Sequence, residues 1–183
     1  SVTRIGTYAF SRCSGLTSIV IPSSVTSIGH NAFEACTELE TVYNLSNLTF
    51  SKGSSDYGYV AYYADNVYNI PNGSLEGDFI FGKLNGVNTL VGYLGNDAEL
   101  TLPADYKGKN YMIGNYAFSG RTGLTSIEIP NSVICIGNGA FSGCTDLAGI
   151  EIPCSVTSIG QDAFRGTAWY NNQLDGLVYA GKV

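Results

Sequence analysis

The stretch Leu16–Glu38, LTSIVIPSSVTSIGHNAFEACTE, decides the fold because its pattern returns along the chain in steps of 23 residues. Its first fourteen residues reappear as LTSIEIPNSVICIG from Leu124, with ten of fourteen positions identical, and as LAGIEIPCSVTSIG from Leu147. The phenylalanine of the recurring Ala-Phe pair is found at Phe10, Phe33, Phe118, Phe141 and Phe164. A period this regular predicts a stack of similar coils, each contacting only its neighbours.

Each unit predicts two short extended segments followed by a turn. Ile19 and Ile21 alternate with Ser18 and Val20, as in a half-buried strand. The proline that follows Ile21 ends this strand, since it has no N–H for a central ladder. A second extended segment ends at a glycine, which permits a turn that a side chain would resist. We expect Phe33 to follow in one helical or 3-10 turn and to fill the interior of the coil.

The period fails between Ser46 and Asp97. This segment is rich in tyrosine, and it contains Asn85-Gly86 between two extended stretches, Asp78–Phe81 and Thr89–Tyr93. Asn-Gly between such stretches is a strong hairpin signal. We therefore expect a small antiparallel β insertion that packs on the stacked coils.

These boundaries divide the chain into four segments within one continuous structural domain. They are N-terminal repeat units at 1–45, the first of them incomplete, the tyrosine-rich hairpin insertion at 46–97, C-terminal units at 98–168, and a tail at 169–183. Asp175-Gly176 predicts a second hairpin in the tail, which either begins another insertion or covers the open end of the stack. Because the chain begins in mid-repeat and ends abruptly, we expect it to be a piece of a longer protein.

The recurring pattern LTSIxIPxxVxxIGxxAFxxC resembles the BspA-like class of leucine-rich repeats, and the resemblance covers the chain outside the insertion and the tail. It implies a leucine-rich-repeat solenoid, α/β by convention but dominated by β-structure, with short helical or 3-10 turns. The LTSIxIP segments would form its parallel β ladder. The chain departs from the pattern at Arg121, which replaces the motif cysteine, and in the insertion. No functional residue carries over, because the motif positions are structural.

The resemblance also implies a bacterial secreted or cell-surface protein, since several members are described as adhesins. We therefore expect a non-enzymatic module that binds an extracellular protein or a glycan. Two alternatives stay open. The chain could be a structural spacer without its own ligand, or, more remotely, the insertion could hold a hydrolase site built from Asp56, Asp65, Glu76 and Asp78.

Composition narrows the classes of partner. The net charge is −6, the pI is about 4.6, and basic residues form no run. Nucleic acids and anionic membranes attract basic patches, so neither is an expected partner. No stretch approaches the ~20 apolar residues of a membrane helix, so we expect no membrane insertion. The open ends of a solenoid could support end-to-end self-association.

The sequence offers little for catalysis, metals or cofactors. His30 is the only histidine and lies in a variable turn position, where an exposed turn residue is the expected role. The chain has no CxxC pair and no DxDxDG calcium loop. We therefore expect no catalytic, metal-binding or cofactor-binding residue and no cofactor.

Five cysteines, an odd number, leave at least one unpaired. Cys13, Cys36 and Cys144 share one repeat position, three residues after the phenylalanine. Equivalent residues of adjacent coils lie about 4.8 Å apart, but their parallel side chains are poorly directed for a disulfide. We expect buried free thiols at this position.

Two surfaces are candidates for binding. Outward residues of the stacked LTSIxIP strands would form one continuous sheet face, and tyrosine suits interfaces because it combines contact area with a polar tip. The alternatives are a solvated sheet face without a partner, and tyrosines that pack the insertion onto the solenoid. The candidate residues are Val20, Tyr43, Thr101, Glu128 and Glu151 on the ladder and Tyr57, Tyr59, Tyr62 and Tyr63 in the insertion.

Overall fold

The structure is a computed structural model that describes residues 1–172 of the 183-residue chain. The hairpin predicted at Asp175-Gly176 therefore lies outside the described residues. The chain divides into two compact units, Ser1–Ser74 and Leu75–Val183, in place of the single continuous domain that we expected. About seven coils of about 23 residues make up a β-solenoid that is mostly strand, as predicted.

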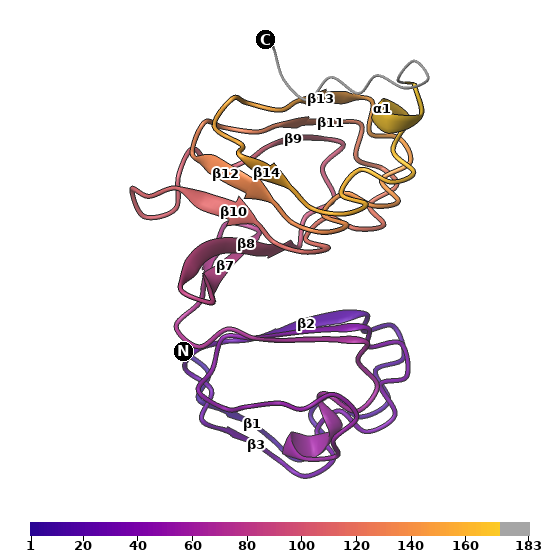
Figure 1. Cartoon of the computed structure of the whole chain (residues 1–183). Helices are drawn as coiled ribbons and strands as arrows, with labels where there is room; N and C mark the ends of the chain where they lie inside the picture. Colours follow the sequence, from indigo (N-terminus) through magenta and orange to yellow (C-terminus); the bar gives the residue numbers. More distant parts are fainter. Residues whose placement is uncertain (173–183) are drawn as a thin grey trace. The chain divides into compact units, whose positions relative to one another are not determined.

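Unit 1 contains two small parallel sheets, one on each side of its coils (Figure 1). The first sheet has Ile19, Val42 and Val67 side by side, one from each coil. The second pairs Ile5 with Ile28. The strands are β2 (Ser18–Ile21), β4 (Thr41–Asn44) and β5 (Asn66–Asn69) in the first sheet, and β1 (Arg4–Ile5) and β3 (Ser27–Ile28) in the second.

Unit 2 repeats this plan with more strands. One sheet has the order β13-β11-β9, with all strands parallel: β9 (Glu99–Thr101), β11 (Ser126–Glu128) and β13 (Gly149–Glu151). The other has the order β14-β12-β10-β8-β7-β6. Its strands are β6 (Ser74–Glu76), β7 (Phe79–Leu84), β8 (Val87–Tyr93), β10 (Tyr111–Ile113), β12 (Val133–Ile136) and β14 (Ser158–Ile159). The short helix α1 (Ala168–Asn171) follows the last coil.

The recurring phenylalanines fill the coils, as predicted. Phe33, Phe118 and Phe141 have no exposed surface. The ring centroids of Phe118 and Phe141 lie 5.2 Å apart with nearly parallel planes, and Phe141 and Phe164 continue the stack at 5.4 Å. One aromatic column therefore runs through the regular coils of unit 2, and Phe10 and Phe33 stack in the same way in unit 1.

The turn before each phenylalanine differs from the expected helical or 3-10 turn. The residue two positions before it has a left-handed backbone, with φ of 53° at Asn31, 57° at Tyr116 and 56° at Asp162. Residues of positive φ cannot continue a right-handed helix, so each turn ends at once. A glycine precedes this turn because the backbone of the preceding coil leaves no room for a side chain. A Cβ on Gly137 would lie 2.6 Å from the Asn115 backbone nitrogen.

The boundary that we placed at residue 46 is wrong, because residues 46–70 form a third coil of unit 1. Its strand β5 pairs in parallel with β4, so that Asn44 lies beside Asn69. The N–H of Phe33 donates to the Gly58 oxygen of the third coil. In the same way, the N–H of Phe10 in the first coil donates to the Ala32 oxygen in the second. We call residues 46–70 the third coil.

The predicted Asn85-Gly86 hairpin is present, and it is the segment that interrupts the series of repeats. Strands β7 and β8 pair antiparallel, with Leu84 beside Val87 on either side of the turn. Strand β8 also pairs in parallel with β10, so the hairpin extends a sheet of unit 2. Arg121, at the motif cysteine position, donates to the backbone oxygens of Tyr93 and Gly95 and holds this segment to the first complete coil.

The cysteines are free, but only two of the three at the repeat position are buried. The thiols of Cys36 and Cys144 each donate to the phenylalanine carbonyl of the preceding coil, at 3.0 Å. Burial raises the pKa of both thiols. Cys13 is exposed, which contradicts our expectation; unlike Cys36 and Cys144, its coil has no preceding coil among the described residues.

Candidate functional site

The ladder residues of unit 1 lie side by side. Val20, Tyr43 and Tyr68 share one register position on β2, β4 and β5. The rings of Tyr43 and Tyr68 stack with centroids 5.4 Å apart and planes 11° apart. The sequence analysis did not propose Tyr68 as a ladder residue, because it assigned this residue to the insertion and not to a third strand of the ladder.

The ladder residues of unit 2 form a separate group, so the continuous sheet face that we expected is wrong. Thr101, Glu128 and Glu151 are neighbours across β9, β11 and β13, whereas Val20 and Tyr43 belong to another sheet. The Thr101 hydroxyl donates to the Glu128 carboxylate at 3.3 Å. Two carboxylates on adjacent strands give this face a negative potential.

The sequence-predicted tyrosines Tyr57, Tyr59, Tyr62 and Tyr63, which we call the third-coil tyrosines, include a connected aromatic group of Tyr59, Tyr62 and Tyr63. The Tyr62 ring meets the Tyr59 ring at 73° and the Tyr63 ring at 80°, with centroids 5.3 and 5.0 Å away. Tyr57 and Tyr62 keep 38% and 47% of their surface exposed. These side chains are therefore neither fully buried in a core nor isolated on the surface.

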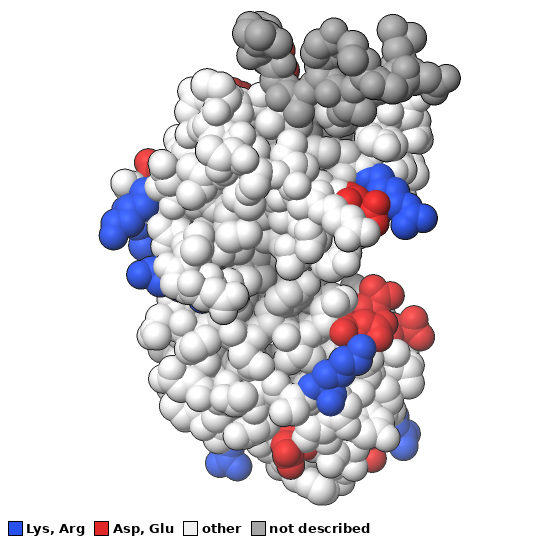
Figure 2. All heavy atoms as spheres, viewed as in Figure 1, with Lys and Arg blue, Asp and Glu red and all other residues white. Residues whose placement is uncertain are grey.

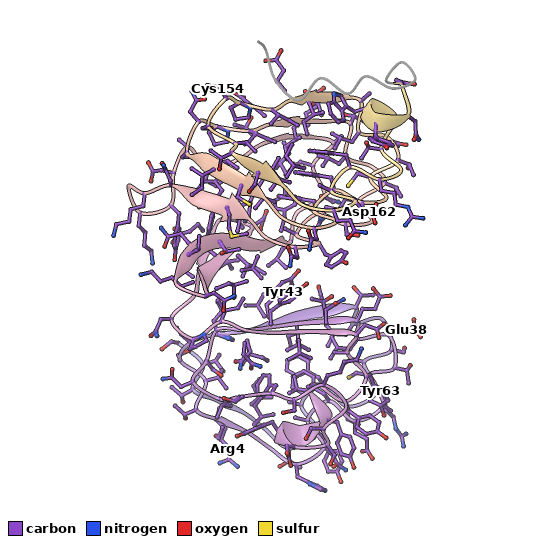
Figure 3. All side chains as sticks on the ribbon, in the orientation of Figure 1. Arg4, Glu38, Tyr43, Tyr63, Cys154 and Asp162 are labelled. Atoms are coloured by element: carbon purple, nitrogen blue, oxygen red, sulfur yellow. The ribbon has the colours of Figure 1, made fainter. Side chains whose placement is uncertain are left out.

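Part of this group has a structural role. The Tyr63 hydroxyl accepts a hydrogen bond from the Ala35 N–H at 3.2 Å, which attaches the third coil to the second. The Tyr57 ring packs against the buried Phe50 ring at 5.3 Å. Figure 3 shows that Tyr43 and Tyr63 extend from different sides of unit 1, so the ladder and the third-coil tyrosines are separate surfaces.

Two of the residues considered for chemistry, His30 and Asp65, make local contacts in unit 1. His30 is an exposed turn residue whose backbone oxygen accepts from the Tyr8 N–H. The Asp65 carboxylate pairs with the Lys52 ammonium at 3.3 Å. Across residues 1–172, no three His, Cys, Asp or Glu side chains lie close enough to hold a metal ion. The same residues include no helix that is long and apolar enough to cross a membrane.

Comparison with known protein families identifies the repeat. The model of the BspA type leucine-rich repeat region matches six copies, over residues 1–70 and 105–176. The chain belongs to this family. The matched range 1–70 includes the third coil, and the gap between the two ranges contains the β7–β8 hairpin.

Solved structures of leucine-rich repeat proteins resemble the chain. A leucine-rich cell surface protein from Faecalibacterium prausnitzii is 28% identical, with 91% of this chain and 43% of that one covered and a TM-score of 0.43. A leucine-rich repeat protein from Bacteroides capillosus is 26% identical, with 53% and 93% covered and a TM-score of 0.40. The chain thus spans less than half of the Faecalibacterium protein. No curated protein matches it significantly.

The structure also draws attention to a surface that the sequence analysis missed. The left-handed turn residue of each coil in unit 2 is Tyr116, Gly139 or Asp162, and Tyr116 and Asp162 are exposed. Tyr116 is 58% exposed, the largest exposed fraction among the described tyrosines. A signal existed in the sequence, since Tyr116 stands two residues before Phe118, where Gly139 stands before Phe141.

Proposed function

We propose that this chain is a non-enzymatic binding module of a secreted or surface-attached bacterial protein, and that its third-coil tyrosines contact an extracellular protein or glycan. One observation carries the proposal. Tyr57 and Tyr62 are 38% and 47% exposed, whereas Phe118 and Phe141 of the regular coils are fully buried. Exposed tyrosine offers rigid contact area with a polar tip, which suits recognition.

The backbone of the third coil supports the same proposal. Tyr57, Gly58 and Tyr59 are three successive left-handed residues, with φ of 52°, 64° and 69°. A left-handed backbone costs roughly 1–2 kcal/mol at each non-glycine residue. Glycine or asparagine would reduce this cost at Tyr57 and Tyr59. Bulky side chains held in such a conformation concentrate at sites of function, which favours binding over simple packing.

The surroundings of the tyrosines suit a partner of low charge. Lys52 and Asp65 neutralise each other nearby. On the face drawn in Figure 2 uncharged side chains predominate, and the charged ones lie mostly along its margins. A surface of this kind gains little from long-range electrostatic steering, so its affinity would come from contact area and hydrogen bonds. The two ladder groups, Val20 with Tyr43 and Thr101 with Glu128 and Glu151, are the secondary candidate surfaces.

The proposal is tested by screening the chain against extracellular matrix proteins and a glycan array, followed by affinity measurements with variants. Tyr62→Ala should weaken binding at least about tenfold, because alanine scanning attributes most binding energy to a few large side chains. Tyr170→Ala is the matched control, since Tyr170 is 49% exposed but lies in α1.

A chain that binds nothing in either screen would instead be a structural spacer. Equal binding by the Tyr62→Ala and wild-type chains would remove the third-coil tyrosines from the proposal and direct attention to the ladder groups.

A further inference from the structure

The outward turns of unit 2 form a row that we call the turn edge. Its left-handed residues are Tyr116, Gly139 and Asp162, with φ of 57°, 57° and 56°. Backbone hydrogen bonds join them in order: the Tyr116 N–H donates to the Asn138 oxygen at 3.0 Å, and the Gly139 N–H donates to the Gln161 oxygen at 2.9 Å. Residues on successive coils are therefore neighbours along this edge.

The Tyr116 ring lies against the backbone of the next coil. A Cβ built on Gly139 would stand 2.4 Å from Tyr116 Cε1 and 2.6 Å from Cδ1, so a larger residue there would displace the ring from this position. Gly139 itself is buried, while Tyr116 keeps 58% of its surface exposed. The ring is thus supported on one side and open to solvent on the other.

Tyrosine is not the residue that the local backbone favours here. Glycine, asparagine and aspartate tolerate a left-handed conformation best, and Gly139 and Asp162 show those choices on the neighbouring coils. Tyr116 replaces such a residue at a conformational cost and without entering the core. Tyr8 stands at the same turn position in unit 1 with φ of 58°, but Asn31 follows it on the next coil, so the glycine beneath the exposed ring is what sets Tyr116 apart.

Side-chain amides directly precede Tyr116 and Gly139 in the chain. The Asn115 Oδ1 accepts from the Asn138 N–H, and the Asn138 Oδ1 accepts from the Gln161 N–H, both at 2.9 Å. Because each carbonyl oxygen is bound to the backbone, the amide orientation is set, and the Nδ2 groups remain as donors. Both asparagines are exposed, and no hydrogen bond from either Nδ2 occurs among the described residues.

Acceptors are present on the same edge. Asp162 occupies the next left-handed position, its side chain is 51% exposed, and its carboxylate lies 4.0 Å from the Arg165 guanidinium. Figure 3 shows Asp162 at the margin of unit 2, on the turn side of its coils. An open ring, oriented amide donors and a carboxylate acceptor are therefore arranged within three adjacent coils.

We propose that the turn edge of unit 2 binds a neutral pyranose sugar, with Tyr116 stacking on the sugar ring and Asn115, Asn138 and Asp162 bonding to its hydroxyls. The C–H face of a pyranose is apolar and matches an exposed aromatic ring, which attracts C–H groups through its negative face. Adjacent hydroxyls both donate and accept, as fixed amides and a carboxylate require. The net charge of −6 disfavours acidic sugars.

This inference goes beyond the proposed function, because it uses a different surface and holds whether or not the third-coil tyrosines bind anything. The test is saturation-transfer difference NMR of the whole chain with methyl glycosides of glucose, galactose, mannose and N-acetylglucosamine. We expect transfer to the ring C–H protons of at least one glycoside, with weak affinity because a single sugar covers little area.

Variants assign the signal to the turn edge. Tyr116→Ala should weaken binding at least about tenfold, whereas Tyr116→Phe should retain it, since the ring face makes the contact. Asn138→Asp keeps the oxygen that accepts from Gln161 but loses the Nδ2 donor, and it should weaken binding severalfold. Circular dichroism should show that each variant keeps the wild-type fold.

Tyr8→Ala is the matched control, because Tyr8 is 55% exposed and left-handed at the same turn position in unit 1, and it should bind the glycoside as the wild-type chain does. If no glycoside receives saturation, or if Tyr116→Ala binds as well as the wild-type chain, the proposal is overturned. Loss of binding in Tyr62→Ala alone would also overturn it, and would assign the sugar to the third-coil tyrosines instead.

Discussion

The coils that contain Phe118 and Phe141 keep their aromatic rings inside, stacked 5.2 Å apart, whereas the third coil exposes Tyr57 and Tyr62. Both regions nevertheless use the same parallel backbone register, since β5 continues the ladder of β2 and β4. The difference shows that stacking depends on only a few residue positions in each coil. A coil that still satisfies those positions can change its turn and direct large side chains toward solvent.

The largest expected effect tests the interior of the regular coils. Phe141→Ala should lower the free energy of unfolding by about 3–5 kcal/mol, as truncation of a buried phenylalanine does. Phe141 has no exposed surface and stacks on two neighbouring rings. Urea denaturation measures the change. A loss below about 1 kcal/mol would contradict the role of Phe141 as the coil filler.

A second substitution tests how the third coil is attached. A Cβ on Gly58 would stand 2.3 Å from the Gly29 oxygen, at a φ of 64°. Gly58→Ala should therefore cost about 2–5 kcal/mol, from left-handed strain and overpacking together.

Gly53 is the matched control for this substitution, because its φ is 76° but nothing lies within 4 Å of an added Cβ. Gly53→Ala should cost only the strain, roughly 1–2 kcal/mol. Equal losses in the two variants, measured by thermal unfolding, would show that residues 46–70 do not stack closely on the second coil.

The smallest effect concerns the thiols. Burial raises the pKa of Cys144 and Cys36 above the ordinary value of 9.0, so the folded state holds these thiols protonated. Their contribution to stability is complete below that value and falls as the pH rises past it. At pH 8, iodoacetamide should modify exposed Cys13 at least about tenfold faster than Cys144.

Mass spectrometry of the alkylated chain measures these rates, and denaturant should make all five thiols reactive. Protection of Cys13 equal to that of Cys144 would mean that another part of the protein, or a second copy, covers the first coil.

Much of the fold could be predicted from the sequence, because the residues that stack follow a pattern that is visible within each unit. The alternation of apolar and polar residues within one unit predicts the inward positions of Ile19, Ile21 and Phe33. The Asn85-Gly86 pair by itself predicts the hairpin turn. The third coil could not be recognised in this way. Its strand lies 25 residues after β4, with Thr41 beside Asn66, and the buried Asn44 and half-buried Asn69 replace the expected aliphatic pair.

That asparagine pair shows why pattern alone failed. Asn44, in register with Ile21, is fully buried, and a polar residue at a core position normally argues against a strand of the stack. Here the Asn44 Nδ2 donates to the Asn69 Oδ1 at 2.8 Å, and the Asn69 Nδ2 donates to the Phe50 oxygen at 2.8 Å. The hydrogen bond between the two amides forms only after the coils have stacked.

By itself, the sequence determined the period, the residues that fill each regular coil, the hairpin and the family, since each depends on side chains close together along the chain. The tertiary structure alone decided that residues 46–70 are a coil, that the ladder residues lie in two separate sheets, and that Tyr116 rests on Gly139. These features arise between residues 22 or more positions apart, where the register of one coil on the next selects which side chains meet.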